Sequence, residues 1–322
     1  MKPLWLAAAL LLLILLAACS LFIGVGDLSP RALWEGDETG RAQLFLLVSR
    51  VPRTLALILT GSSLAIAGLV LQIIVRNRFV EPSTIGTSES ATLGFLTATV
   101  FFPAWPMMGK MGLSALFALG GTALFLRLTR AIPAREVLLV PLVGIMLSGV
   151  IGAITTFFGY RFDLLPSLLA WSMGDFSGVL RGRYELLWLA FGGTLAAWLA
   201  ADRLTVAGMG EDFSANLGLN YRHVMIFGLV IVAVVSAVCL VSTGSIPFLG
   251  LIVPNIVSLW VGDNMRATVP WVAVTGAIFV LACDMIGRLV RFPYEIPISV
   301  VLGVIGSAMF LYLLLRTRRH AY

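Results

Sequence analysis

Long apolar runs separated by short polar segments dominate this chain. A helix that crosses a bilayer needs roughly 20 residues, so runs of this length predict transmembrane helices. Two runs are marginal, the third because it is short and the eighth because prolines and glycines interrupt it. The ten runs lie near residues 4–23, 54–75, 91–102, 112–128, 137–158, 186–201, 224–241, 246–261, 270–290 and 297–315. The pattern predicts an all-α polytopic membrane protein of about ten helices, in one transmembrane domain over residues 1–322.

The eighth run is the most informative one, because it is apolar yet unsuited to a regular helix. Its sequence, Gly244-Ser-Ile-Pro-Phe-Leu-Gly-Leu-Ile-Val-Pro-Asn255, contains two prolines and two glycines. In hydrocarbon, an unpaired backbone amide or carbonyl costs several kcal/mol, so broken helices occur where protein or water supplies the partners. Such a segment indicates a transport pathway.

The composition supports a membrane protein and leaves no room for a soluble catalytic module. Hydrophobic residues make up 59% of the chain, charged residues make up 12%, and the mean hydropathy is +1.00. The formal charge is +6, but the arginines are scattered, which argues against nucleic-acid binding. Three isolated cysteines and two distant histidines predict no metal site and make an intramembrane enzyme a poor alternative. No phosphate-binding loop is present either, because Ala104 stands where its first glycine belongs ahead of Gly109 and Lys110.

The basic residues at both ends predict the orientation of the chain. Lys2 and the tail Arg316-Thr-Arg318-Arg319 place both termini in the cytoplasm, because basic residues beside spans are retained on that side. A cleaved leader ending at Leu16-Ala17-Ala18-Cys19 is an alternative for the N-terminus. Apolarity continues past Cys19, which favours a spanning helix instead.

A polar segment near residues 208–220 predicts a short helix outside the bilayer. Glu211 and Asp212 fall in its first turn, where the helix dipole favours carboxylates, and Gly218 suits a left-handed cap. Phe213 and Leu217 are four residues apart and project from one face. From spacing alone, a solvated connector and a docking element are equally good interpretations.

Four motifs in order give the chain a resemblance that can be named. They are Arg50-Val-Pro-Arg53, Arg76-Asn-Arg-Phe-Val-Glu-Pro82 with Ile85-Gly86, Gly244 to Pro254, and Glu295-Ile-Pro297 ahead of Gly303 and Gly306. With these motifs the chain resembles the FecCD family of iron-siderophore and cobalamin ABC importer permeases, over essentially its whole length. The variant Pro-Asn-Ile-Val-Ser with Gly262-Asp-Asn264 is similar to the branch that serves catecholate-type siderophores.

The resemblance implies a type II ABC importer permease fold and a set of partners. These are a second permease subunit, expected to be a related chain and not a second copy, two ATPase subunits, and a periplasmic or lipid-anchored substrate-binding protein. The cargo would be a ferric siderophore, and the location the bacterial inner membrane. ATP and Mg²⁺ would bind to the ATPase subunits, leaving this chain without a cofactor and without enzymatic activity.

The resemblance also implies roles for particular residues. The coupling helix that contacts the ATPase would comprise Gly210, Glu211, Asp212, Phe213, Leu217 and Gly218. Arg50, Arg53 and Arg288 would dock the binding protein, although Arg288 could instead pair with Asp284 one helical turn away. The pathway and its gate would involve Asn77, Glu81, Pro82, Ile85, Glu89, Leu138, Leu139, Ser148 and Thr155.

Two alternatives to a siderophore importer stay open at this point. An ion-coupled secondary transporter would show similar broken helices, but it predicts a relay of membrane-embedded acids, for which only Asp284 and Glu89 qualify. The same importer class could also carry cobalamin or haem.

Overall fold

The computed structural model describes residues 2–24, 41–129, 132, 139–182, 184–262 and 264–319, and every regular element in these ranges is helical. The principal helices are α1 (Lys2–Phe22), α4 (Val51–Val75), α5 (Thr87–Phe101), α6 (Met107–Thr129), α7 (Leu139–Arg161), α9 (Leu187–Leu199), α12 (Tyr221–Thr243), α13 (Leu249–Val261), α14 (Met265–Leu289) and α15 (Ile298–Arg319). Shorter elements are α3 (Arg41–Phe45), the π-helix η1 (Leu46–Arg50), the 3₁₀ helices η2 (Pro82–Thr84) and η3 (Tyr184–Leu186), α8 (Leu165–Ser172), α10 (Ala201–Met209) and α11 (Glu211–Asn216).

In the described ranges, six helices are long and apolar enough to cross a membrane, and a seventh span results if the bent pair of α9 and α10 is counted as one. The pair bends by 65° at its break. The apolar helices α13 and α15 are shorter than the usual span. The prediction of an all-helical membrane protein is therefore confirmed, whereas the count of ten spans stays a prediction.

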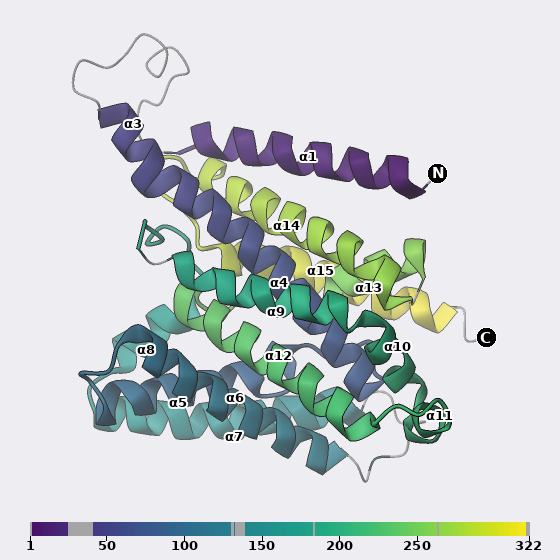
Figure 1. Ribbon diagram of the computed structural model, residues 1–322. Helices are drawn as coiled ribbons and strands as arrows, with labels where there is room; N and C mark the ends of the chain where they lie inside the picture. The colour runs from purple at the N-terminus through teal and green to yellow at the C-terminus, as the bar shows by residue number, and fades with distance from the viewer. Residues whose placement is uncertain are drawn as a thin grey trace.

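Helix α4 forms the centre of the bundle, and α9, α12, α13 and α14 pack around it (Figure 1). Helices α5, α6, α7 and α8 form a group on one side, while α1 lies along the outside. Two glycine pairs allow the closest approaches to α4: a Cβ on Gly61 would lie 2.7 Å from the carbonyl oxygen of Gly276, and one on Gly68 would lie 2.0 Å from that of Gly250. Small residues permit such tight packing between membrane helices.

The start of α1, α11 and the last turns of α15 lie at the same end of the molecule, called here the α11 end (Figure 1). Helix α3 and the start of α4 lie at the opposite end, called here the α3 end. The start of α1 and the last turns of α15 thus share one end of the molecule, while the placement of both termini in the cytoplasm stays a prediction.

The irregular eighth run becomes helical only at Leu249, after a non-helical start. Gly244 ends α12 with a φ of +82°, and α13 begins at Leu249. A Cβ on Gly244 would lie 2.3 Å from the carbonyl oxygen of Met173, so this position has no space for a side chain. The five residues 244–248 are therefore a non-helical approach to α13, and Pro254 lies inside the helix.

Gln72 of α4 compensates for Pro254. Proline has no N–H, so the Gly250 carbonyl one turn earlier loses its helical donor. Gln72 Nε2 donates to that carbonyl oxygen at 3.2 Å and reaches the Leu251 oxygen at 3.5 Å. Gln72 is itself buried, so each group supplies the partner that the other needs.

We expect Gln72→Leu to lower the free energy of unfolding by about 1–3 kcal/mol, because the Gly250 carbonyl is left buried without a donor. Pro254→Ala restores a backbone N–H at residue 254, so the double variant should recover much of that loss. Thermal unfolding in detergent of the two single variants and the double variant measures the effect. If the double variant lost as much stability as the two single variants together, the proposed compensation of Pro254 by Gln72 would be wrong.

Candidate functional site

Five charged side chains gather at the α3 end, and they form what we call the Arg53 cluster: Arg50, Arg53, Asp284, Arg288 and Glu295. Arg53 lies between the two acids, with Nη2 2.8 Å from Asp284 Oδ1 and Nη1 2.7 Å from Glu295 Oε2. Arg288 forms an ion pair with Asp284 one turn earlier on α14. All but Glu295 are buried, so charge neutralisation within the cluster is needed to offset desolvation.

The remaining donors of the cluster hold the end of α1. Arg288 donates to the carbonyl oxygens of Ser20 and Ile23 at 3.0 and 2.7 Å, and Arg50 donates to the same Ile23 oxygen at 2.7 Å. Cations at a helix C-terminus pair with carbonyls that have no helical donor. Few residues of α1 are buried against the bundle, so these bonds attach its end to η1 and α14.

The structure thus places the three arginines predicted to dock a binding protein in internal contacts. The helical pair between Arg288 and Asp284, the alternative suggested by their spacing, is present. Arg50, Arg53 and Arg288 are 5%, 8% and 2% exposed, so their observed partners belong to this chain. Docking by these residues stays a prediction, and any partner would have to compete with Asp284, Glu295 and the end of α1.

Asp284→Asn should lower the free energy of unfolding by about 3–5 kcal/mol, because it leaves buried guanidinium groups without their shared counter-ion. The matched control is Asp202→Asn, since Asp202 pairs with Arg266 where both side chains are more than half exposed. That change should cost less than about 1 kcal/mol. Chemical denaturation in detergent compares the two, and equal small losses would show that the cluster contributes little.

Glu81 lies in the segment between α4 and α5 and joins this segment to the start of α13. Glu81 Oε1 accepts the Phe248 N–H at 2.7 Å and the Ser83 hydroxyl, and Oε2 accepts the Leu251 N–H at 3.1 Å. The first N–H groups of a helix have no helical acceptor, and the helix dipole favours an acidic group there.

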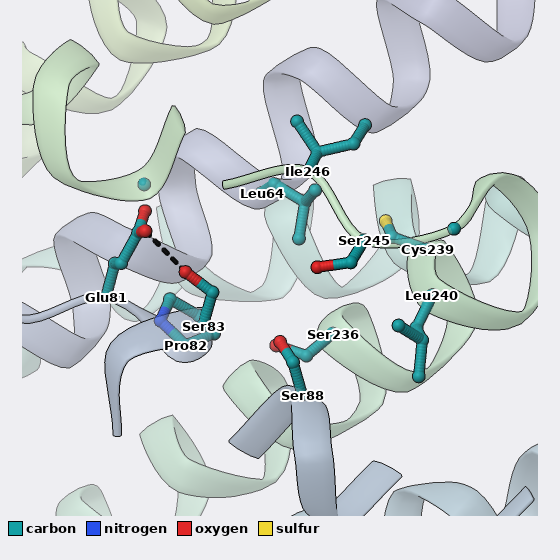
Figure 2. A pocket seen from close by; sticks show the side chains of 12 residues that line it. Leu64, Glu81, Pro82, Ser83, Ser88, Ser236, Cys239, Leu240, Ser245 and Ile246 are labelled. Carbon is teal, nitrogen blue, oxygen red and sulfur yellow. Dashed lines mark hydrogen bonds between the residues drawn. The ribbon is translucent and has the colours of Figure 1, made fainter. Parts of the chain in front are cut away.

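A small cavity of about 20 Å³ adjoins Glu81, enough for one water molecule. Figure 2 shows the Ser83 hydroxyl bonded to Glu81, and the hydroxyls of Ser88 and Ser236 turned toward the same space. Ser236 Oγ is buried and has no hydrogen-bond partner among the described residues. The cavity and its polar lining mark the place where α12, α13 and the segment before α5 meet.

Glu81→Gln should lower the free energy of unfolding by about 1.5–3 kcal/mol. The glutamine NH₂ group is a donor, and it would replace a carboxylate oxygen that accepts from the N–H groups of Phe248 or Leu251. Glu185→Gln is the control, since Glu185 also accepts a backbone N–H, that of Gly182 at 2.9 Å, but at an exposed position. The control should change stability by no more than about 0.5 kcal/mol. Thermal unfolding in detergent measures both variants, and an equal response would remove the special role of Glu81.

The other residues predicted for the pathway or gate differ in their surroundings. Asn77, Pro82, Ile85 and Thr155 are buried, and Ile85 packs into the core beside Leu147 and Ile151 of α7. Leu139 is exposed at the start of α7, and Leu138 lies outside the described residues. Glu89 Oε2 on α5 and Ser148 Oγ on α7 are buried polar atoms without a hydrogen-bond partner among the described residues. Their role in a pathway stays a prediction.

The predicted coupling segment forms α11, a helix of six residues at the α11 end. Gly210 precedes it with a φ of +127°, and Gly218 follows with a φ of +74°, so both glycines occupy backbone conformations that other residues rarely adopt. Ser214 fixes α11 by donating to the carbonyl oxygens of Val206 and Gly210. Phe213 and Leu217 are 48% and 58% exposed, and Glu211 and Asp212 are exposed beside them. Gly208 and Met209, expected in this segment, instead complete α10.

Comparison with known proteins identifies the group to which this architecture belongs. The model of the FecCD transport family matches residues 11–316. This chain belongs to the FecCD transport family. A petrobactin import system permease protein of Bacillus subtilis (strain 168) is 44% identical over 97% of this chain and 98% of its own length. A ferric-anguibactin transport system permease protein of Vibrio anguillarum is 40% identical over 94% of this chain and 95% of its own length.

A FecCD assignment agrees with the fold comparison. A solved structure described as an inward-facing conformation of a metal-chelate type ABC transporter aligns with a TM-score of 0.80 at 27% identity. The alignment covers 98% of this chain and 99% of that one. A vitamin B12 import system permease protein of Citrobacter koseri is more distant, at 32% identity over 98% of this chain and 95% of its own length.

Sequence reasoning missed two features of this FecCD chain. Gln72 is a polar residue in the apolar run Leu69-Val-Leu-Gln-Ile-Ile74, and that isolation was an available signal. No pattern in the sequence indicated the hydrogen bonds from Arg50 and Arg288 to the end of α1. Their acceptor is the backbone carbonyl of Ile23, which is far from both arginines in the sequence.

Proposed function

We propose that this chain is the permease subunit of an ATP-driven importer that carries a ferric siderophore across the bacterial inner membrane. The observation that carries the proposal is the near full-length identity to a petrobactin permease within the FecCD family. The Gly262-Asp-Asn264 variant supports a catecholate-type cargo. Cobalamin or haem is less well supported as cargo, because the vitamin B12 permease is a more distant relative.

The proposed assembly contains a second, related permease chain, two ATPase subunits and a substrate-binding protein on the outer face. ATP and Mg²⁺ bind to the ATPase subunits, and this chain carries no cofactor and no catalytic residue. In this arrangement the α11 end faces the cytoplasm and the Arg53 cluster faces the binding protein. The ten-span topology follows if α5, α13 and α15 each cross the membrane together with the non-helical segments beside them.

The proposed energy transfer runs through α11. Phe213 and Leu217 are large apolar side chains exposed at the same end of the molecule as the last turns of α4 and α10. Exposed apolar side chains outside a bilayer gain free energy when a partner covers them. We assign them to a groove on the ATPase, with Glu211 and Asp212 at its polar rim. Alternating access then follows from ATP-driven movement of the two α11 helices in the assembly.

An ion-coupled secondary transporter is the second candidate class, and it requires membrane-embedded acids in a relay. Asp284 is held by Arg53 and Arg288, and Glu81 by three donors, so neither is available to pass ions in this conformation. Glu89 alone does not make a relay. The geometry therefore favours the ATP-driven class.

The double variant Phe213→Asp with Leu217→Asp should abolish uptake of ⁵⁵Fe-labelled catecholate siderophore in cells and reduce the ATPase that co-purifies with the tagged chain. Losing two buried apolar contacts, worth about 1.5–3 kcal/mol each, predicts at least a tenfold loss of association. Ala215→Asp with Asn216→Asp is the control, because it adds the same charge to other faces of α11. Normal uptake and ATPase retention in the Phe213 and Leu217 variant would refute the coupling role.

A further inference from the structure

A large cavity opens at the α11 end, between α4, α10, α13 and the start of α14. Its volume is about 530 Å³, within the range of roughly 300–1,000 Å³ that is typical of ligand pockets. Leu69 and Ile73 of α4 line it together with Pro254 of α13. Because Ile73 and Leu69 precede the end of α4 at Val75 by about half a turn and just under two turns, this apolar wall runs from the α11 end toward the middle of the molecule.

The mouth of the cavity carries positive charge. Arg76 and Arg78 line it, both side chains are exposed, and the described residues of its wall include no aspartate or glutamate. Arg78 Nη1 lies 3.5 Å from Ser258 Oγ, and Asn255 Nδ2 donates to the carbonyl oxygens of Arg78 and Leu251, which holds Arg78 against α13. Guanidinium groups present several N–H donors in the geometry that suits phosphate and carboxylate oxygens.

Arg76 occupies an unusual backbone conformation at the mouth of the cavity. It ends α4 in the left-handed conformation, with a φ of +53°. This conformation is a helix cap, because the N–H groups of Arg76 and Asn77 donate back to carbonyl oxygens in the last turn of α4. The Arg76 guanidinium lies beside the start of α11, where a Cβ on Gly210 would be 3.2 Å from Arg76 Nη2. The cap therefore turns the chain at the point where Arg76 lines the cavity.

We propose that this cavity binds a phosphate-bearing anion, supplied by the headgroup of an anionic phospholipid. The phosphate contacts Arg76 and Arg78, and an acyl chain follows Leu69 and Ile73 along α4. Basic pockets between membrane helices are suited to anionic lipid headgroups, which are concentrated in the cytoplasmic leaflet. A free phosphate offers the same chemistry to the arginines, but it leaves the apolar wall unused.

The test measures thermal unfolding of the full chain, purified and delipidated in detergent, during titration with dioleoylphosphatidylglycerol, dioleoylphosphatidylcholine or inorganic phosphate. The cavity variant is Arg76→Gly with Arg78→Gln, in which glycine suits the left-handed backbone and keeps the chain folded. The control variant is Arg127→Gln with Arg222→Gln. It removes the same charge from two exposed arginines outside the cavity wall.

Phosphatidylglycerol should stabilise the native chain and the control variant at similar concentrations, and the cavity variant should need on the order of tenfold more lipid. Phosphatidylcholine should act weakly on all three. Stabilisation by inorganic phosphate that equals that by phosphatidylglycerol and requires the same arginines would support the phosphate site and assign it to a free anion. Equal responses of all three chains to phosphatidylglycerol would overturn the proposal. An unchanged lipid response together with loss of co-purifying ATPase in the cavity variant would also overturn it, because the cavity would then contact protein.

Discussion

The need to pair every buried backbone group governs the centre of this structure. Two non-helical segments, residues 77–81 and 244–248, meet beside α4 at a place where water cannot serve as their general partner. Glu81 takes the first N–H groups of α13, and Gln72 supplies the donor that Pro254 lacks. Two side chains from one short stretch therefore make it possible for α13 to begin and continue inside the bundle.

The two ends of the molecule differ in how their charged side chains are arranged. At the α3 end, four buried charges and the half-buried Glu295 pair with each other and with the end of α1, which joins α1, α4 and α14. At the α11 end, charges are exposed, and a short helix is held by its flanking glycines and Ser214. The enclosed cluster suits a fixed junction, whereas an exposed helix with two uncovered apolar side chains suits a contact with another subunit.

Several elements of the candidate site were predictable because they depend on local chemistry. The first-turn acids, the apolar pair Phe213 and Leu217, and the Gly218 cap follow from spacing, and α11 forms where they indicate. The i, i+4 spacing of Asp284 and Arg288 likewise indicated their ion pair. The start of α5 was less predictable, because its first turn is the polar stretch Thr87-Ser-Glu-Ser90 and carries no apolar period.

The sequence by itself determined the class of this protein, its FecCD resemblance and the places where helices must break, because hydropathy, proline and glycine act locally. Only the tertiary structure decided what those features contact. Glu81 and Gln72 reach α13 across more than 160 residues, and Arg53 reaches Asp284 and Glu295 across more than 230. Whether an arginine is exposed for a partner or enclosed by its own chain depends on which helices pack together, and no local pattern records that.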